Sequence, residues 1–461
     1  MIGNPIVSTD FPVDYASGNG STTAFTLSIA PASVNAIDVQ ISGVAQSPQT
    51  YSVSGTTLTF SAAPPSGSNN IVVRHKGIAG IPNTPSAASV VTSSIAANAV
   101  TPAKMANGGA EFGYRNRIIN GAMVISQGAG GGAITPAVAA TYATNYPVDR
   151  FVVQVSQASK LTTQQNAGSV TPPAGFTNYL GITSSSAYSI ISTDIFKIQQ
   201  PIEGFNTADL SWGTADAKTV TLSFWVRSSL TGTFGGSLNN NTANRSYPFS
   251  YSIPVANTWT KISVTVAGDT SGTWITNNGI GVYVIWSLGT GSTYSGTAGA
   301  WTGTNVQSVT GATSVVGTSG ATFYITGVQL EVGTTATNFD YRSYGTELSL
   351  CQRYYWRNAS AGTMGFSSGF AATTTLFRGT VTLPVPMRTN PVASLTNPSN
   401  TIIINSNVNL TSVSLSNYFL SATGGSLDVA GTGTLVTGYG AVMLDNAGTA
   451  GVASLNYSAE L

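Results

Sequence analysis

The stretch 323–357 constrains the fold most, because the period of its apolar residues changes along it. Apolar and polar residues alternate over 323–330, as in the last strand of a β-sandwich. Gly333 and the Thr/Ala run after it end this strand. From Ser343 onward, apolar residues recur at steps of four and three, which places them on one helical face. The residues of this face are Tyr344, Leu348, Cys351 and Tyr355. We therefore predict a sheet strand followed by a single junction helix at 341–357.

The chain is short of charge. Charged residues make up 7 % of the sequence, against about 25 % in an average soluble protein. Hydrophobic residues make up 42 % and the net charge is +1, whereas disorder requires low hydrophobicity together with high net charge. We therefore predict a folded, all-β protein with a polar but uncharged surface. We expect no general attraction to nucleic acid or to anionic lipid.

The cysteine count and the first residues bear on where the chain is made. One cysteine is present, so no disulfide can form within a chain. The start, MIGNPIVSTD, lacks the basic and apolar regions of a signal peptide. No run approaches the about 18 apolar residues of a membrane span. We expect synthesis in a cytoplasm without secretion, and no insertion into a membrane.

Turn-rich segments divide the sequence into five parts. Short strands separated by Gly, Ser and Pro clusters fill 1–80 and predict a compact β-sandwich. The Ala/Ser/Thr-rich segment 81–110 is either a flexible linker or a stalk, in which spaced apolar residues meet their copies from neighbouring chains. A large sandwich is predicted for 111–340 and a smaller one for 358–461, joined by the helix at 341–357.

Few titratable groups are available for catalysis. His75 is the only histidine, and we expect it on the surface of its strand. Cys351 is predicted to be a buried apolar group rather than a nucleophile. Glycan hydrolysis needs a pair of carboxylates, and one short segment could supply them, although we expect its acids to solvate loops. These acids are Asp194, Glu203, Asp209 and Asp216. We predict no enzyme activity, no metal site and no cofactor.

Aromatic residues in polar loops are the candidates for binding. Sugars present apolar C–H faces and polar rims, so aromatic rings beside uncharged hydrogen-bonding groups suit them. Trp225 and Trp286 lie within strands and are expected in the core. The candidate receptor- or glycan-binding residues are Trp274, Tyr294 and Trp301, with Phe370 and Tyr418 in the C-terminal part.

Several phrases resemble parts of tail-fibre proteins of tailed bacteriophages. The stretch ITGVQLEVG…RSYG…LCQRYY within 323–357 is similar to a segment that closes a jelly-roll domain like carbohydrate-binding modules and leads into a distal tip domain. RNRIINGAMVISQG at 115–128 and TNYPVDRFVVQV at 144–155 resemble strand regions of the same modules. Residues 1–80 resemble a podophage tail-anchor domain, and NAVTPAKM at 98–105 resembles a stalk unit.

The resemblance implies a homotrimeric tail fibre in the virion. Residues 1–80 would attach to the tail or to an adaptor protein, and the C-terminal domains would bind a host-surface receptor such as a glycan. Threefold symmetry would give the apolar helix face its own copies as partners, so the predicted trimer interface is Tyr344, Leu348, Cys351 and Tyr355. Two alternatives stay open: a free monomeric carbohydrate-binding adhesin, and a tailspike that depolymerises glycans.

Overall fold

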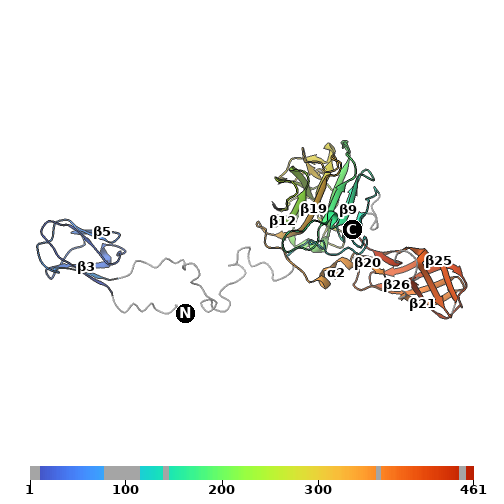
Figure 1. The fold of residues 1–461 in the computed structure, drawn as a ribbon. Helices are drawn as coiled ribbons and strands as arrows, with labels where there is room; N and C mark the ends of the chain where they lie inside the picture. The colour runs from blue at the N-terminus through green and yellow to red at the C-terminus, as the bar shows by residue number, and fades with distance from the viewer. Residues whose placement is uncertain (1–10, 77–114, 139–144, 360–364, 407, 446–452) are drawn as a thin grey trace. The chain divides into compact units, whose positions relative to one another are not determined.

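A computed structural model describes most of the chain, and both of its compact units, Met1–Thr101 and Pro102–Leu461, consist mainly of strands (Figure 1). The all-β class predicted from the sequence is confirmed. The predicted linker or stalk at 81–110 lies outside the described residues. The described residues are 11–76, 115–138, 145–359, 365–406, 408–445 and 453–461.

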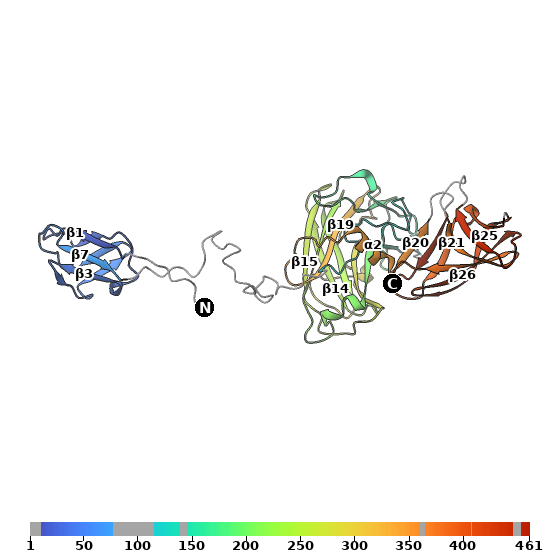
Figure 2. The ribbon, with the colours of Figure 1, turned by 90° about the horizontal axis from the view of Figure 1, so that it is seen from below.

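The first unit is a small two-sheet sandwich. One sheet has the order β1-β7-β3-β4, with β1, β7 and β3 side by side (Figure 2), and the other has the order β2-β6-β5. Alternate residues of the strands point between the sheets and form the core, among them Ile37, Leu58 and Ile71. The strands are β1 (Val13–Ala16), β2 (Ala24–Thr26), β3 (Ile37–Ile41), β4 (Val44–Ala45), β5 (Tyr51–Ser54), β6 (Thr57–Phe60) and β7 (Ile71–His75).

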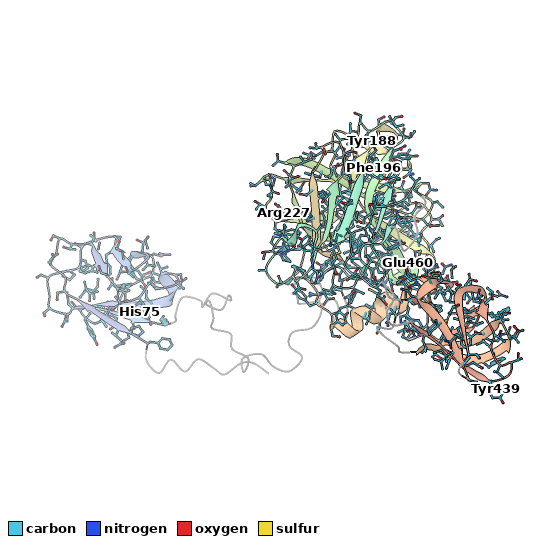
Figure 3. All side chains as sticks on the ribbon, turned by 45° about the vertical axis from the view of Figure 1, so that its right-hand side comes forward. His75, Tyr188, Phe196, Arg227, Tyr439 and Glu460 are labelled. Carbon is cyan, nitrogen blue, oxygen red and sulfur yellow. The ribbon has the colours of Figure 1, made fainter. Side chains whose placement is uncertain are left out.

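His75 lies inside this unit, and its expected surface position is wrong (Figure 3). It shares the inward-facing period of Ile71 and Val73 on β7, so its ring is buried. Its Nε2 lies 2.9 Å from Oδ2 of Asp14. Partial burial opposes ionisation of Asp14, but hydrogen bonds from His75 and Ser28 outweigh it and lower the pKa of this carboxyl.

The second unit begins with a large jelly-roll sandwich. Its sheets have the orders β15-β12-β19-β10-β9 and β14-β13-β16-β11-β8, and aromatic residues such as Phe224, Trp286 and Phe323 fill the space between them. The strands are β8 (Val152–Val155), β9 (Leu161–Gln165), β10 (Leu180–Ser184), β11 (Ile195–Glu203), β12 (Val220–Ser228), β13 (Gly232–Asn239), β14 (Ser246–Ile253), β15 (Thr260–Val266), β16 (Ile280–Thr290), β17 (Ser295–Gly296), β18 (Ser308–Val309) and β19 (Thr322–Val332).

The segment 115–128, which resembles an opening strand, contains no strand in the structure. It docks as an extended segment beside β19 instead. The Asn116 side chain donates to the carbonyl of Val328 at 2.9 Å and accepts from the amide of Leu330 at 3.1 Å. The carbonyl of Gly121 accepts from the amide of Val328. The amide side chain thus takes the place of a strand partner.

The helix α2 (Tyr344–Gln352) is shorter than predicted and is the one α-helix of the described ranges. Ser343 occupies the N-cap position, but its hydroxyl pairs with that of Thr346 at 2.8 Å rather than with a backbone amide. Tyr355, predicted on the helix, begins β20 (Tyr355–Ala359). It pairs there with Ser458 about a hundred positions away, so sheet pairing overrides the helical period.

The predicted trimer face of this helix packs against its own chain. Cys351 is fully buried against Ile119 and Ile125, and the half-buried Leu348 packs on the same cluster. Tyr355 is buried elsewhere, against Tyr146 and Val152. Cys351 and Tyr355 are therefore not placed to contact another chain, because segment 119–125 and β8 already cover them. In the predicted set, Tyr344 is exposed.

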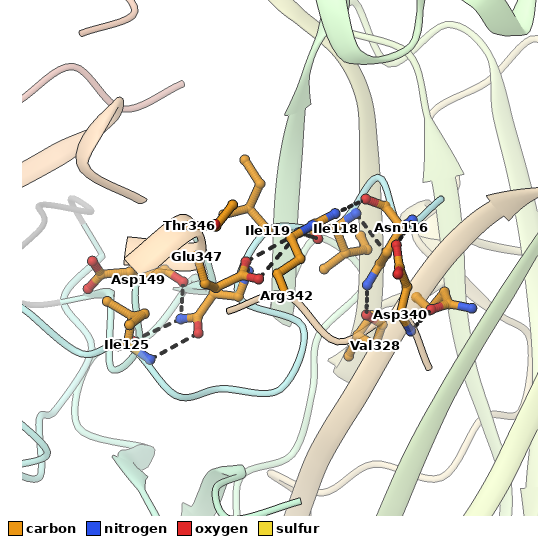
Figure 4. Close-up of polar contacts among 12 residues, drawn as sticks. Asn116, Ile118, Ile119, Ile125, Asp149, Val328, Asp340, Arg342, Thr346 and Glu347 are labelled. Carbon is orange, nitrogen blue, oxygen red and sulfur yellow. Dashed lines mark hydrogen bonds and ion pairs between the residues drawn. The ribbon is translucent and has the colours of Figure 1, made fainter. Parts of the chain in front are cut away.

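A polar network ties α2 to the start of the jelly roll (Figure 4). Arg342 donates to the carbonyl of Ile118 at 3.0 Å and forms an ion pair with Glu347 at 3.3 Å. Glu347 in turn accepts from the backbone amide of Asn120. Asp340 accepts from the amide of Arg115 at 2.8 Å. Segments more than two hundred positions apart are thereby joined by side-chain to backbone bonds.

The C-terminal part closes into a barrel of order β21-β22-β26-β25-β24-β27, with a separate sheet β20-β28-β23 beside it. The sequence predicted a second, smaller β-sandwich for 358–461. The 14-residue β25 shifts register twice against β26, and such bulges bend a strand enough to close a sheet. The remaining strands are β21 (Gly365–Thr373), β22 (Leu376–Thr382), β23 (Val392–Thr396), β24 (Thr401–Asn405), β25 (Val408–Ser421), β26 (Gly424–Gly433), β27 (Gly440–Asp445) and β28 (Ser454–Ser458).

Candidate functional site

The structure brings two of the predicted binding residues together. The ring centroids of Trp274 and Trp301 lie 5.4 Å apart, and both rings contact Trp212, which follows the 3₁₀ turn Ala208–Leu210. Trp301 packs within this cluster and donates its indole N–H to the carbonyl of Ala267 at 2.7 Å. Trp274 instead lines a recess of about 380 Å³, named here the tryptophan recess.

The other predicted binding residues are dispersed. Tyr294 is half-buried in a short 3₁₀ turn (Ser292–Tyr294) and lines neither recess of the jelly roll described here. Phe370 is exposed on the barrel, whereas Tyr418 is half-buried there. Strands β22 and β26 separate these two, and on them Arg378 and Asp428 form an ion pair.

A second recess combines more aromatic rings than the first. It has a volume of about 420 Å³ and lies on the outer face of the sheet that contains β12, with the loop at 337–341 as one rim. We call it the aromatic groove. Its lining residues are Phe176, Ser223, Trp225, Lys261, Gly327, Thr337, Asn338, Phe339 and Tyr341.

The alternation of β12 directs Trp225 into the aromatic groove. Leu222 and Phe224 are fully buried in the core, so Ser223 and Trp225 point to the opposite face. Lys261 on β15 stands directly opposite Trp225 in the antiparallel register. Opposite residues of such a pair share a face, and the lysine therefore lies beside the indole ring.

Gly327 lets two rings of the groove come close. It sits at a bulge where β19 shifts register against β12, and its φ is +61°. A Cβ at this position would lie 2.6 Å from the ring of Phe176 and 3.0 Å from that of Trp225. Both the left-handed backbone and the space require glycine here.

The far wall of the groove is a cluster of three rings. The ring centroid of Phe339 lies 5.1 Å from that of Phe176 and 4.8 Å from that of Tyr341, and both ring pairs meet edge to face. The hydroxyl of Tyr341 donates to the carbonyl of Gly175 at 2.9 Å. This bond fixes the Tyr341 ring against the loop that carries Phe176, so the wall is formed before any ligand arrives.

Buried side chains of β19 hold the rim of the groove in place. Glu331 accepts from the amide of Thr337 at 2.8 Å and from its hydroxyl at 2.7 Å. The side-chain oxygen of Gln329 accepts from the amide of Asp340 at 2.8 Å. The segment carrying Asn338 and Phe339 is thus bonded at both ends, which lowers the entropy cost of ordering it around a ligand.

The groove offers apolar faces beside neutral and cationic hydrogen-bonding groups. The indole N–H of Trp225 donates to no residue in the described ranges. Ser223, Asn338 and Lys261 add hydroxyl, amide and ammonium groups at the rim, and no carboxylate is among the lining residues. The arrangement suits a ring with an apolar face and a hydroxylated edge, as in a sugar.

Sequence reasoning missed the residues of the aromatic groove. Trp225 was expected in the core with Trp286, and that expectation holds for Trp286 but not for Trp225. The signal was present: Trp225 shares the period of Ser223 and Arg227, not that of the apolar Leu222 and Phe224. Phe176 and Phe339 lie in loops, where no period indicates their direction.

Three of the four acidic residues considered for a catalytic pair have separate partners. Asp194 accepts from Ser156 and Tyr188, Glu203 pairs with Arg353, and Asp209 pairs with Arg117. Asp216 lines the tryptophan recess. Cys351 is buried as predicted, and burial raises the pKa of its thiol. Within the described ranges, no group of three His, Cys, Asp or Glu residues could hold a metal, and no helix is long and apolar enough to span a membrane.

Comparisons with known proteins find solved structures that have low sequence identity and low TM-scores with this chain. No protein-family profile and no curated protein matches the chain. Among solved structures, the enzymatically active domain of tailspike protein 4 of bacteriophage CBA120 is 11 % identical over 48 % of this chain, with a TM-score of 0.27, and only 22 % of that domain is covered. The family 11 carbohydrate-binding module of Clostridium thermocellum is 10 % identical over 44 % of this chain and 98 % of its own, with a TM-score of 0.22. A xylanase 10B fragment from the same organism is 13 % identical over 48 % of this chain and 31 % of its own, with a TM-score of 0.22.

Proposed function

We propose that this chain is a bacteriophage tail fibre that binds a host-surface glycan in the aromatic groove of its jelly roll. The observation that carries the glycan part is the groove itself: four aromatic side chains surround it, with hydroxyl, amide and ammonium groups at the rim. The sequence resemblance to tail fibres, described above, supports the virion role. The protein binds and does not cut its receptor.

Substitution of Trp225 tests the binding site. Trp225→Ala removes the ring that faces the groove, and we expect affinity for host polysaccharide to fall at least about tenfold, the equivalent of about 1.4 kcal/mol. Trp225→Phe should keep part of the affinity, because a smaller aromatic face remains. Binding is measured by isothermal titration of purified polysaccharide into the full-length chain.

Phe370→Ala is the matched control. It removes an exposed ring from the barrel and should leave the affinity unchanged. If Phe370→Ala weakens binding and Trp225→Ala does not, the receptor site lies in the barrel and the groove assignment is wrong. Release of reducing ends from the polysaccharide during the titration would favour the depolymerase alternative.

The trimeric part of the proposal has its own test. Three weak sites on one axis gain avidity because the second and third contacts become intramolecular. Light scattering of the full-length chain should therefore give three times 47.1 kDa. A monomeric mass would contradict the fibre and favour the free carbohydrate-binding adhesin.

The first unit offers a surface for attachment to the tail. β1 lies at the edge of its sheet. Phe11, just before this strand, is 54 % exposed, and Val13 and Tyr15 on it are 38 % and 63 % exposed. Exposed apolar residues along an edge strand favour the aggregation of a free protein. A tail or adaptor protein that covers them would remove this tendency, which supports residues 1–80 as the anchor.

A further inference from the structure

The tryptophan recess lies apart from the aromatic groove and has a different charge. Two indole rings, Trp212 and Trp274, form its apolar wall, and Asp216 is the one charged residue among those that line it. The side chain of Asp216 is exposed and forms no ion pair with any described residue. The lining is completed by Thr207, Ala208, Ser211, Thr214, Ile275, Thr276 and Val282.

The two indole rings are fixed by bonds to the backbone. Trp212 donates its N–H to the carbonyl of Lys218 at 2.8 Å, and Trp274 donates to that of Ser271 at 3.2 Å. The rings meet edge to face at 4.8 Å, and Trp301 supports both from 5.3 and 5.4 Å. Since both N–H groups are used inside the protein, the indole rings that line the recess offer apolar surface and no free donor.

The loop that carries Trp274 is anchored by a buried carboxylate. Asp269 accepts from Nε and Nη2 of Arg245 at 2.7 and 2.6 Å. Gly213 has a φ of +87°, and a Cβ on it would lie 3.1 Å from the Trp274 ring. The ion pair of Arg245 and the close approach at Gly213 thus fix the position of the Trp274 ring, so the recess is formed without a ligand.

Aromatic faces next to an unpaired carboxylate recognise positive charge. The negative face of an indole attracts an ammonium group, and the attraction becomes stronger as water is excluded. The Asp216 carboxylate adds direct attraction, and no basic residue lines the recess to compete with it. Hydroxyls from Thr214 and Thr276 can accept the remaining N–H bonds of an ammonium group.

We propose that the tryptophan recess binds the ammonium group of an amine-bearing sugar, as a second subsite that distinguishes free amino sugars from their acetylated or hydroxylated forms. The choice of a sugar rests on the glycan-binding function proposed above. The recognition of positive charge rests on Trp212, Trp274 and Asp216 alone.

Two sugars that differ in one group test this inference. Glucosamine carries an ammonium group at about pH 6, and N-acetylglucosamine has the same ring without the charge. Ligand-observed NMR titration of each sugar into the full-length chain gives both affinities. We expect glucosamine to bind at least about fivefold more tightly than N-acetylglucosamine, and Asp216→Asn to remove this difference.

Asp38→Asn controls for net charge, because it removes one exposed carboxylate from the other unit. It should leave glucosamine binding unchanged. Trp274→Phe should weaken binding by less than Asp216→Asn while keeping the packing with Trp212.

Equal binding of the two sugars, absence of saturation by glucosamine, or an Asp216→Asn variant that binds like the parent would each overturn the inference. Trp225→Ala should not change glucosamine binding, so a failure here is distinguishable from a failure of the aromatic groove.

Discussion

Lys197 is a buried cation with no ionic partner in the described part of the chain. It lies on β11 with its side chain on the face away from the core, opposite Ser287, and it is 7 % exposed. Burial lowers its pKa from 10.5 to about 7. The same strand and β13 add buried polar atoms that lack partners among the described residues, including the side-chain oxygens of Gln199 and Asn239.

Because Lys197 is buried, we predict that the free energy of unfolding rises with pH. Below about pH 7 both the folded and the unfolded state carry its proton, so the full cost of burying the charge is present. Between about pH 7 and pH 10.5 the unfolded state binds the proton and the folded state does not, so stability increases with pH by at most about 1.4 kcal/mol per unit. Lys197→Met should raise the free energy of unfolding at pH 7 and flatten this slope, as measured by urea unfolding between pH 6 and pH 9.

Lys218→Met is the control for this prediction, because Lys218 is exposed. It should change neither the free energy of unfolding at pH 7 nor its slope. A parent chain whose stability is flat above pH 7 would show that Lys197 has a partner in solution, and the assignment of an unpaired buried lysine would be wrong.

Single residues were predictable from the sequence where one local rule decides their place. Cys351 is buried because it shares an apolar helix face with Leu348, and the sequence shows that face directly. His75 and Trp225 were placed wrongly because residue type was weighed above strand period. A histidine on the inward period of β7 is buried despite its polarity, and a tryptophan on the outward period of β12 is half-exposed despite its size.

At the scale of elements, strands in the jelly roll were found close to their predicted places. The run 219–227, with the apolar composition of an inner strand, became β12 (Val220–Ser228), and the alternating run 259–266 became β15 (Thr260–Val266). The end of α2 was missed because Tyr355 and Trp356 fit either a helix or a strand. Pairing with β28 decides between them, and a local period contains no information about a partner so distant in the sequence.

The aromatic groove depends on an element that sequence patterns do not show. Gly327 reads as an interruption in an otherwise regular strand, whereas in the structure it is the bulge that lets Phe176 and Trp225 converge. The rim depends in turn on Gln329 and Glu331, which bond a loop six to eleven residues onward. The sequence predicted the domain that contains the groove, whereas the register of the strands is what brings the groove residues together.

At the scale of the whole second unit, charged side chains join the jelly roll to the barrel. Arg150 pairs with Glu460 and donates to the carbonyl of Pro201 at 2.6 Å. Arg388, which precedes β23, donates to the carbonyls of Asn278 and Ala459. Several of the few charged residues of the chain lie at this junction. They connect the jelly roll to the barrel although charged residues make up only 7 % of the sequence.

Glu203 is the centre of this junction. Its carboxylate is 1 % exposed and accepts from Nη2 and Nε of Arg353 at 2.6 and 2.9 Å and from the hydroxyl of Tyr354 at 2.6 Å. Burial alone would raise the pKa of Glu203, but these bonds and the charge of Arg353 lower it. The contribution of the charged carboxylate to stability is therefore present above the unfolded pKa near 4.5 and is lost as the pH falls through the lower folded value.

We expect Glu203→Gln to destabilise the second unit by about 1–3 kcal/mol at pH 7, because it leaves Arg353 and Tyr354 with one neutral acceptor. The loss should appear in calorimetry of the full-length chain as a jelly-roll transition and a barrel transition that separate, since the bonds that couple them are weakened.

Asp428→Asn is the matched control: it breaks a two-bond arginine pair of similar geometry within the barrel, so it should lower the barrel transition alone. As the pH falls from 4.5 through the lower folded pKa of Glu203, the parent should approach the Glu203→Gln variant, because its own carboxylate becomes protonated. A variant that unfolds at the same temperature as the parent at pH 7 would show that Arg150 and Arg388 hold the two parts together without Glu203.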